Sequence, residues 1–192
     1  LGDELCKRAK LDCVWVTNEW DSIIPNLVSG NYDAIIAGMS ITPERDEVID
    51  FTQEYVPASP SAYVALAGNK VDVETGVITA QVNTIQAGYV AGSGADLVEF
   101  PTPDETIAAV KNGEADAVLA DKDYLDPIVA ESGGELEIIG TVSIGGGVGM
   151  GIRESDAELR EKMDAAIASV KADGTLNALL KKHFGDDALI FD

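Results

Sequence analysis

The stretch YDAIIAGMSITPERDEV, residues 32–48, joins an unbroken apolar run to the start of a helix. Residues 33–38 show no polar and apolar alternation, which is typical of a strand in a parallel sheet covered by helices on both faces. Thr42 is a good N-cap and Pro43 a good first helical residue, so a helix is predicted to begin soon after the strand. This arrangement indicates an α/β fold.

Arg45 stands in the first turn of this helix, where the helix dipole disfavours a cation by about 0.3–1 kcal/mol. A bound anion reverses that effect, because the guanidinium fork and the backbone N–H groups both donate hydrogen bonds to a carboxylate. Ser40 adds a hydroxyl at the same strand end. We interpret Ser40 and Arg45 as a carboxylate-binding site; the alternative is surface pairing of Arg45 with the acidic residues at 46–50.

The same pattern occurs a second time in TPDETIAAVKNGEADAVLAD, residues 102–121. Aligning the two copies places Gly30 with Gly113, where each preceding helix ends, and Gly38 with Asp121, at the end of each strand. The two copies predict two lobes, each with a mostly parallel sheet flanked by helices. Ligands of such sheets bind beyond the carboxyl ends of the strands. A cation in one lobe and Asp121 in the other therefore predict a receptor for an α-amino acid zwitterion.

Two segments have the composition of connections between the lobes. FTQEYVPASPSAYVALAG, residues 51–68, is rich in proline and serine, and GTVSIGGGVGMGI, residues 140–152, is rich in glycine. We predict that lobe 1 comprises residues 1–57 and 144–192 and that lobe 2 comprises residues 58–143. The two crossing segments would act as the hinge.

The charge of the chain argues against several classes of partner. The chain carries 34 acidic and 13 basic residues, a formal net charge of -21, so we expect no binding to nucleic acid or anionic membrane surfaces. No apolar run approaches the roughly 20 residues that span a bilayer, and we expect no membrane insertion.

Residues 121–127 lack the glycine and glutamate of a calcium loop, and no nucleophile stands in a recognisable setting. We therefore expect no catalytic residue, no metal and no cofactor.

Cys6 and Cys13 are the only cysteines, and they join an N-terminal amphipathic helix to a predicted strand at 13–18. A short-loop disulfide in an oxidising compartment is one interpretation, and two reduced cysteines in the core are the other. The chain opens within the amphipathic helix and shows no signal-peptide pattern. We expect that any targeting segment has been removed.

Three stretches resemble the periplasmic amino-acid-binding proteins of ABC importers, solute-binding protein family 3: WDSIIPNLVSGNYDAIIAGMSITPERDEVIDFT, VKNGEADAVLAD and GMGIRESDAELREKMDAAIASVKADGTLNALLKKHFG. They cover well over half of the chain in family order. The resemblance implies the two-lobed type II periplasmic-binding-protein fold, a periplasmic location, and capture of a polar or basic L-amino acid for delivery to an ABC permease. ELCKRAKLDC further resembles the branch that binds lysine, arginine, ornithine and histidine, in which the two cysteines form a disulfide.

The resemblance also implies roles for residues of this chain. Arg45 would hold the ligand α-carboxylate, and Asp121 would take the α-ammonium. Ser40 and the Gly38 backbone would contact the ligand head group. Trp20 stands where the family packs an aromatic ring against the ligand side chain.

The sequence departs from the family at two places. The helix start of lobe 2 is usually Gly-Thr-Thr, and residues 83–85 read Asn-Thr-Ile. Thr84 keeps the capping hydroxyl, while Ile85 can offer the ligand only its backbone N–H. The first strand of the family would precede Leu1, so we predict a gap between the first two strands of lobe 1. We expect either that the sequence is part of a longer protein or that a segment from elsewhere fills the gap, as in a swapped dimer.

Two other functions are compatible with these residues. An enzyme on the same fold, such as a cyclohexadienyl dehydratase, would need a general acid facing the cleft. A ligand-sensing domain of a membrane receptor would need a transmembrane segment elsewhere in its gene.

Overall fold

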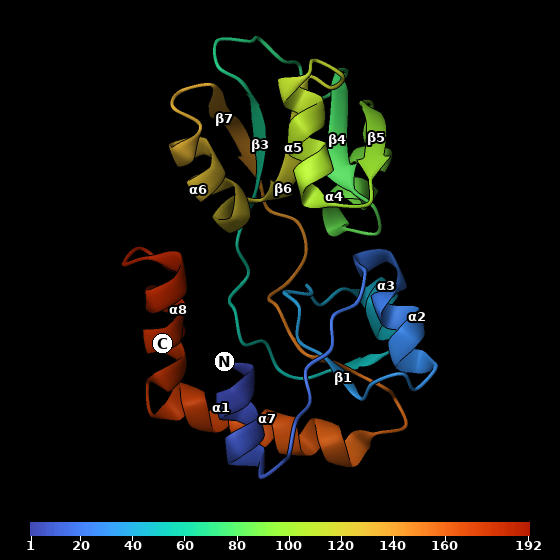
Figure 1. Cartoon of the computed structure of the whole chain (residues 1–192), viewed down its shortest axis with the longest axis vertical. Coiled ribbons are helices and arrows are strands. Elements are labelled where there is room, and N and C mark those ends of the chain that lie inside the picture. The colour runs from blue at the N-terminus through green and yellow to red at the C-terminus, as the bar shows by residue number, and fades with distance from the viewer. The chain divides into compact units, whose positions relative to one another are not determined.

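The computed structural model describes residues 1–192, which form two compact units (Figure 1). Unit 1 comprises Leu1–Ala58 and Gly145–Asp192, and unit 2 comprises Ser59–Ile144. The chain therefore passes from one unit to the other twice. None of its helices combines the length and the apolar composition needed to cross a lipid bilayer.

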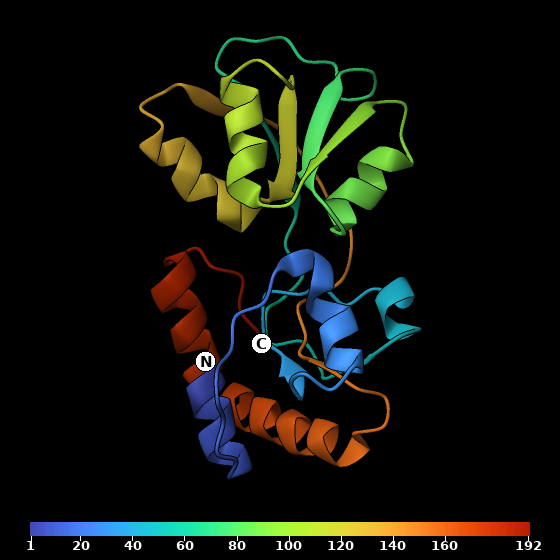
Figure 2. The same ribbon diagram turned by 45° about the vertical axis from the view of Figure 1, so that its right-hand side comes forward.

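Unit 1 consists of helices around a small antiparallel sheet. Its helical elements are α1 (Gly2–Ala9), the 3-10 turn η1 (Trp20–Ser22), α2 (Ile23–Val28), α3 (Pro43–Asp46), α7 (Ala157–Ala172) and α8 (Thr175–Phe184). Its strands are β1 (Ala34–Ile35), β2 (Asp50–Phe51) and β8 (Gly151–Ile152), with β8 between the other two and antiparallel to both. Helix α1 packs against α7 (blue and orange in Figure 2), and Leu5 and Ile167 belong to one buried cluster there.

Unit 2 is a five-stranded sheet with helices on both faces. Its strands are β3 (Ser61–Leu66), β4 (Val77–Gln81), β5 (Asp96–Phe100), β6 (Ala117–Asp121) and β7 (Leu136–Val142), in the order β5-β4-β6-β3-β7. Its helices are α4 (Ile85–Ala91), α5 (Pro103–Lys111) and α6 (Lys122–Glu131). Alternate residues of β3 face opposite sides of the sheet: Val64 belongs to the apolar cluster of α5 and α6, and Tyr63 to that of α4.

The predicted helix-turn-strand repeat is present, with one copy in each unit. Gly30 (φ 80°) and Gly113 (φ 74°) both adopt the left-handed conformation just after α2 and α5. Each glycine N–H bonds to the carbonyl three residues back, at 3.0 and 3.1 Å, and the next N–H bonds to the carbonyl five residues back, at 3.0 and 2.8 Å. This pair of bonds is the Schellman motif. Both helices therefore end by the same local mechanism before β1 and β6.

The α/β class is confirmed, but the prediction of mostly parallel sheets is wrong. All pairs in unit 1 are antiparallel. In unit 2, β4 is parallel to β5 and β6, whereas β3 is antiparallel to β6 and β7. Helical crossovers connect β4, β5 and β6 and so keep them parallel. Strand β3 begins just after one crossing segment and β7 ends just before the other, so these two strands run in opposite directions.

The prediction of a strand at 13–18 is wrong, and the strand predicted at 33–38 shortens to β1. Residues 13–18 belong to no sheet, and the side chains of Val14 and Val16 are exposed. A strand requires backbone hydrogen bonds to a neighbour, and a cavity of about 1,110 Å³ is lined by both this segment and residues 33–37. This cavity lies where the sequence predicts a gap in lobe 1.

The two cysteines form a disulfide, which decides between the two interpretations of the sequence. Cys6 lies in α1 and is buried, and its Cα is 6.2 Å from that of Cys13. Lys10 adopts a left-handed conformation (φ 56°) that ends α1 and turns the chain back toward Cys6.

Candidate functional site

Arg45 lies in the short helix α3. The Thr42 hydroxyl accepts a hydrogen bond from the Arg45 backbone N–H at 3.3 Å, so the predicted N-cap is confirmed. The Arg45 Nη1 donates to the Ser40 carbonyl oxygen at 2.7 Å, and its guanidinium carbon lies 5.6 Å from the centre of the Trp20 ring. The structure thus brings Trp20, Ser40 and Arg45 together. The distance between the Arg45 guanidinium and the Trp20 ring is one at which an aromatic face attracts a cation.

The backbone before α3 is held by residues distant in the sequence. Ser40 forms a bridge with Val148, and the Gly38 N–H donates to the Tyr55 hydroxyl at 3.4 Å. Gly38 has a φ of 70°, and no atom lies within 4 Å of the place where a Cβ would stand, so backbone conformation favours glycine here. Burial raises the pKa of Tyr55 to about 12. The sequence carried no signal for Tyr55, because its contact with Gly38 depends on the fold.

In unit 2, the turn after β4 leads directly into α4. Thr84 caps this helix as predicted: its hydroxyl accepts from the Ala87 N–H at 3.1 Å and donates to the Gln81 carbonyl at 2.7 Å. Asn83 has a φ of 57°, a region that asparagine enters more readily than most residues. Ile85 is the first residue of α4.

Asp121 ends β6, and its carboxylate is held by Gln86, which is not among the residues predicted from the sequence. The Gln86 Nε2 donates to Asp121 Oδ1 at 2.6 Å and to the Ser61 hydroxyl at 2.9 Å. Because β4 and β6 are parallel neighbours, their carboxyl ends lie at one edge of the sheet, which places Asp121 on the same edge as the start of α4. The sequence did hold an indication of the role of Gln86. It lies four residues before Val90 and therefore on the same buried face of the helix, where a polar side chain needs a hydrogen-bond partner.

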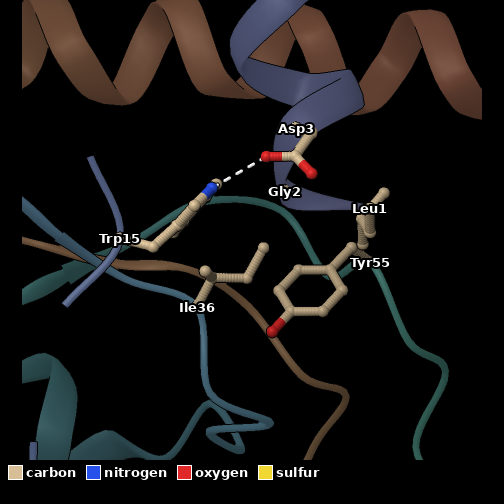
Figure 3. Close-up of a pocket in the computed structure, with 6 residues that line it drawn as sticks. All are labelled: Leu1, Gly2, Asp3, Trp15, Ile36 and Tyr55. Carbon is tan, nitrogen blue, oxygen red and sulfur yellow. Dashed lines mark hydrogen bonds between the residues drawn. The ribbon is translucent and has the colours of Figure 1, made fainter. Parts of the chain in front are cut away.

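Unit 1 contains two cavities near its N-terminal segment. The smaller cavity, about 320 Å³, is shown in Figure 3 and is lined by Leu1, Gly2, Asp3, Trp15, Ile36 and Tyr55. The Trp15 indole N–H donates to the Asp3 carboxylate at 2.8 Å across its rim. Trp15 and Ile36 also line the larger cavity beside residues 13–18. None of the predicted ligand-binding residues lines either cavity.

Comparison with known proteins identifies the family. Residues 1–186 match the bacterial extracellular solute-binding proteins, family 3. The histidine-binding periplasmic protein of Escherichia coli (strain K12) is 34% identical over 210 residues, which cover 97% of this chain and 78% of that protein. The L-arginine-binding protein of Pseudomonas aeruginosa is 30% identical over 207 residues, with the same coverage of 97% and 78%.

A solved structure is more similar still. The crystal structure of a periplasmic His/Glu/Gln/Arg/opine family-binding protein from Silicibacter pomeroyi, in complex with lysine, matches with a TM-score of 0.96 and 69% identity. The match covers 99% of this chain and 87% of that chain.

Two α/β units joined by two crossings, together with this structural match, define a two-lobed solute-binding protein. The chain belongs to family 3 of the bacterial extracellular solute-binding proteins. The predicted resemblance is confirmed, and the expected periplasmic location agrees with the names of the relatives. These relatives are named as binding proteins and not as enzymes, so the dehydratase alternative is not favoured.

Proposed function

We propose that this protein binds a basic L-amino acid and delivers it to an ABC permease. The observation that carries the proposal is the 69% identity, over 99% of this chain, to a protein solved in complex with lysine. The histidine-binding and arginine-binding relatives support the same class of ligand. The net charge of -21 also favours a cationic ligand, because a negative field speeds the arrival of cations.

In unit 1, Arg45 is the proposed partner of the ligand α-carboxylate. Its bond to the Ser40 carbonyl and its position over the Trp20 ring restrict the guanidinium, so less conformational entropy is lost when a carboxylate binds. Ser40 and the Gly38 backbone are proposed to contact the head group, and the Trp20 ring to lie against the ligand side chain.

In unit 2, Asp121 is the proposed partner of the ligand α-ammonium. Thr84 and the backbone N–H of Ile85, at the start of α4, are proposed as further contacts for the carboxylate. The charged groups proposed for the two ends of the zwitterion belong to different units. A single ligand bound by both would link the units, and we propose that binding favours a hinge closure at the crossing segments.

Isothermal titration calorimetry with L-lysine, L-arginine, L-ornithine and L-histidine tests this function. We expect Arg45→Ala and Asp121→Ala each to weaken binding by about 2–5 kcal/mol, the range for removing one partner of a desolvated charge pair. Matched controls are Arg160→Ala, whose guanidinium pairs with Asp50, and Asp126→Ala, whose carboxylate pairs with Lys122. An Arg45 or Asp121 variant within about 1 kcal/mol of the parent would contradict the assignment of that residue.

Two further measurements address the alternative functions. Turnover of prephenate or arogenate by the purified protein would favour the dehydratase, whereas we expect binding without turnover. The permease is tested with the cognate transporter in proteoliposomes, whose ATPase rate should rise when the ligand-loaded protein is added. No rise would contradict the transport role and leave amino-acid binding untouched.

A further inference from the structure

Gln86 is a buried amide that connects three elements of unit 2. It lies in the first turn of α4, is 5% exposed, and donates to Asp121 at the end of β6 and to Ser61 at the start of β3. We propose that Gln86 is a positioning residue, which holds the Asp121 carboxylate in the orientation that receives the ligand ammonium. This inference rests on the proposed role of Asp121 and assigns a second residue to the same function.

The chemistry of the partners determines how the amide is oriented. An ionised carboxylate only accepts hydrogen bonds, so the side of Gln86 that faces Asp121 must be the NH₂ group. The Ser61 hydroxyl can accept the second N–H, and Ser61 is fully buried. Both amide hydrogens are therefore used, one on each partner, and rotation of the amide would break both bonds at once.

The backbone of the cluster is held by the sheet. Ser61 and Asp121 are paired residues of the antiparallel strands β3 and β6, so their Cα atoms stay in register. Gln86 reaches this pair from α4, whose start is held by the Thr84 cap. The amide and the hydroxyl are buried while Asp121 itself is exposed. The buried Gln86 and Ser61 therefore hold the Asp121 carboxylate at the surface of the unit.

Asp121 also occupies a position where another role is expected. It is the N-cap residue of α6, and aspartate at that position commonly accepts a hydrogen bond from the first turn of the helix. In this structure the Asp121 side chain makes no capping bond to α6 and accepts from Gln86. The Asp121 carboxylate is thus oriented by its bond to Gln86 and not by a capping bond to α6. This is the orientation expected of a carboxylate that binds a ligand.

A set of four proteins tests the inference by calorimetry with L-lysine, L-arginine and L-histidine: the parent, Gln86→Met, Asp121→Asn and the double variant. Methionine matches glutamine in length and donates no hydrogen bond. We expect Gln86→Met to raise the Kd by about ten- to a hundredfold, in line with the loss of a hydrogen bond to a charged group. In the Asp121→Asn background the same change should alter the Kd less than about threefold, because coupled residues are not additive.

A ligand analogue separates positioning from general damage. The α-hydroxy acid that corresponds to the tightest-binding amino acid lacks the ammonium, so Gln86→Met should weaken its binding far less than that of the amino acid. The matched control is Gln81→Met, which removes a single bond to the Pro101 carbonyl in the same unit and should leave both affinities unchanged. If Gln86→Met does not fold, Ser61→Ala removes the other anchor of the amide and should show the same dependence on Asp121.

Each outcome points to a different conclusion. Equal losses for the amino acid and the hydroxy acid, or additive effects of the two substitutions, would overturn the positioning role. A parent-like Kd in Gln86→Met together with a weakened Asp121→Asn would overturn this inference alone. A parent-like Kd in Asp121→Asn would instead overturn the proposed role of Asp121.

Discussion

Reducing the disulfide between Cys6 and Cys13 is expected to destabilise unit 1 by about 2.4 kcal/mol and to leave unit 2 unchanged. The two cysteines are seven positions apart, and the loop-closure entropy of so small a ring corresponds to about 2.4 kcal/mol at 25 °C. The segment that follows Cys13 has no strand partner, so the disulfide is a main restraint on its start. Leu5 lies in the same core cluster as Ile167, and loosening of α1 should therefore reach α7.

Urea unfolding followed by hydrogen exchange and mass spectrometry measures this effect in each unit separately. Amides of α1 and α7 should lose protection when the protein is reduced, while amides of β4 and β6 serve as the internal control. The Cys6→Ala/Cys13→Ala double variant shows whether the reductant itself has an effect. A change below about 0.5 kcal/mol in α1 and α7, the range of a neutral substitution, or an equal change in both units would refute the reasoning.

Two further predictions concern stability. The Thr79 hydroxyl is buried without a hydrogen-bond partner, so Thr79→Val should stabilise unit 2 by about 1 kcal/mol in urea unfolding. Thr106→Val removes a hydroxyl that is hydrogen-bonded and should destabilise unit 2 by a similar amount. A change in stability of the same sign for both variants would count against the argument. Hydrogen bonds from Thr175 and from Arg8 lower the pKa of Asp173 from 3.8 to about 2. An acid whose pKa is lowered by folding stabilises the folded state at pH values above its pKa in the unfolded chain. The contribution of Asp173 to stability should therefore be complete above about pH 4 and be lost as the pH falls toward 2. Asp173→Asn should remove that part of the acid dependence, and an unchanged pH profile of unfolding would contradict the assignment.

Features of the fold that depend on a few neighbouring residues could be predicted from the sequence. The capping box of α5, formed by Thr102 and Glu105, is present, and so are the Schellman endings at Gly30 and Gly113. The N-cap at Thr42 and the position of Arg45 just after it follow from the same local rules. These features could be predicted because each is completed by atoms within one helical turn.

Features that depend on distant partners could not be predicted. Residues 13–18 have the composition of a strand and yet form none, since strand formation depends on a hydrogen-bonding neighbour as well as on side chains. The direction of β3 depends on where the chain enters unit 2, which composition does not show. The contact of Tyr55 with Gly38 and that of Gln86 with Asp121 likewise arise only from the pairing of the strands and helices.

The two copies of the helix-turn-strand unit show how one local structure can carry opposite chemistry. Both copies end their helix with the same glycine motif, and the difference lies in the residue at the strand end. In unit 1 that residue is Gly38, whose backbone N–H is a donor, and the guanidinium of Arg45 follows in the first turn of α3. In unit 2 it is Asp121, an acceptor held by a buried amide. The head group of an amino acid zwitterion needs one site of each kind. Under the proposed function, the repeat accounts for recognition of the head group that all amino acids share, and we propose that the choice among basic side chains comes from other residues, of which Trp20 is the first to test.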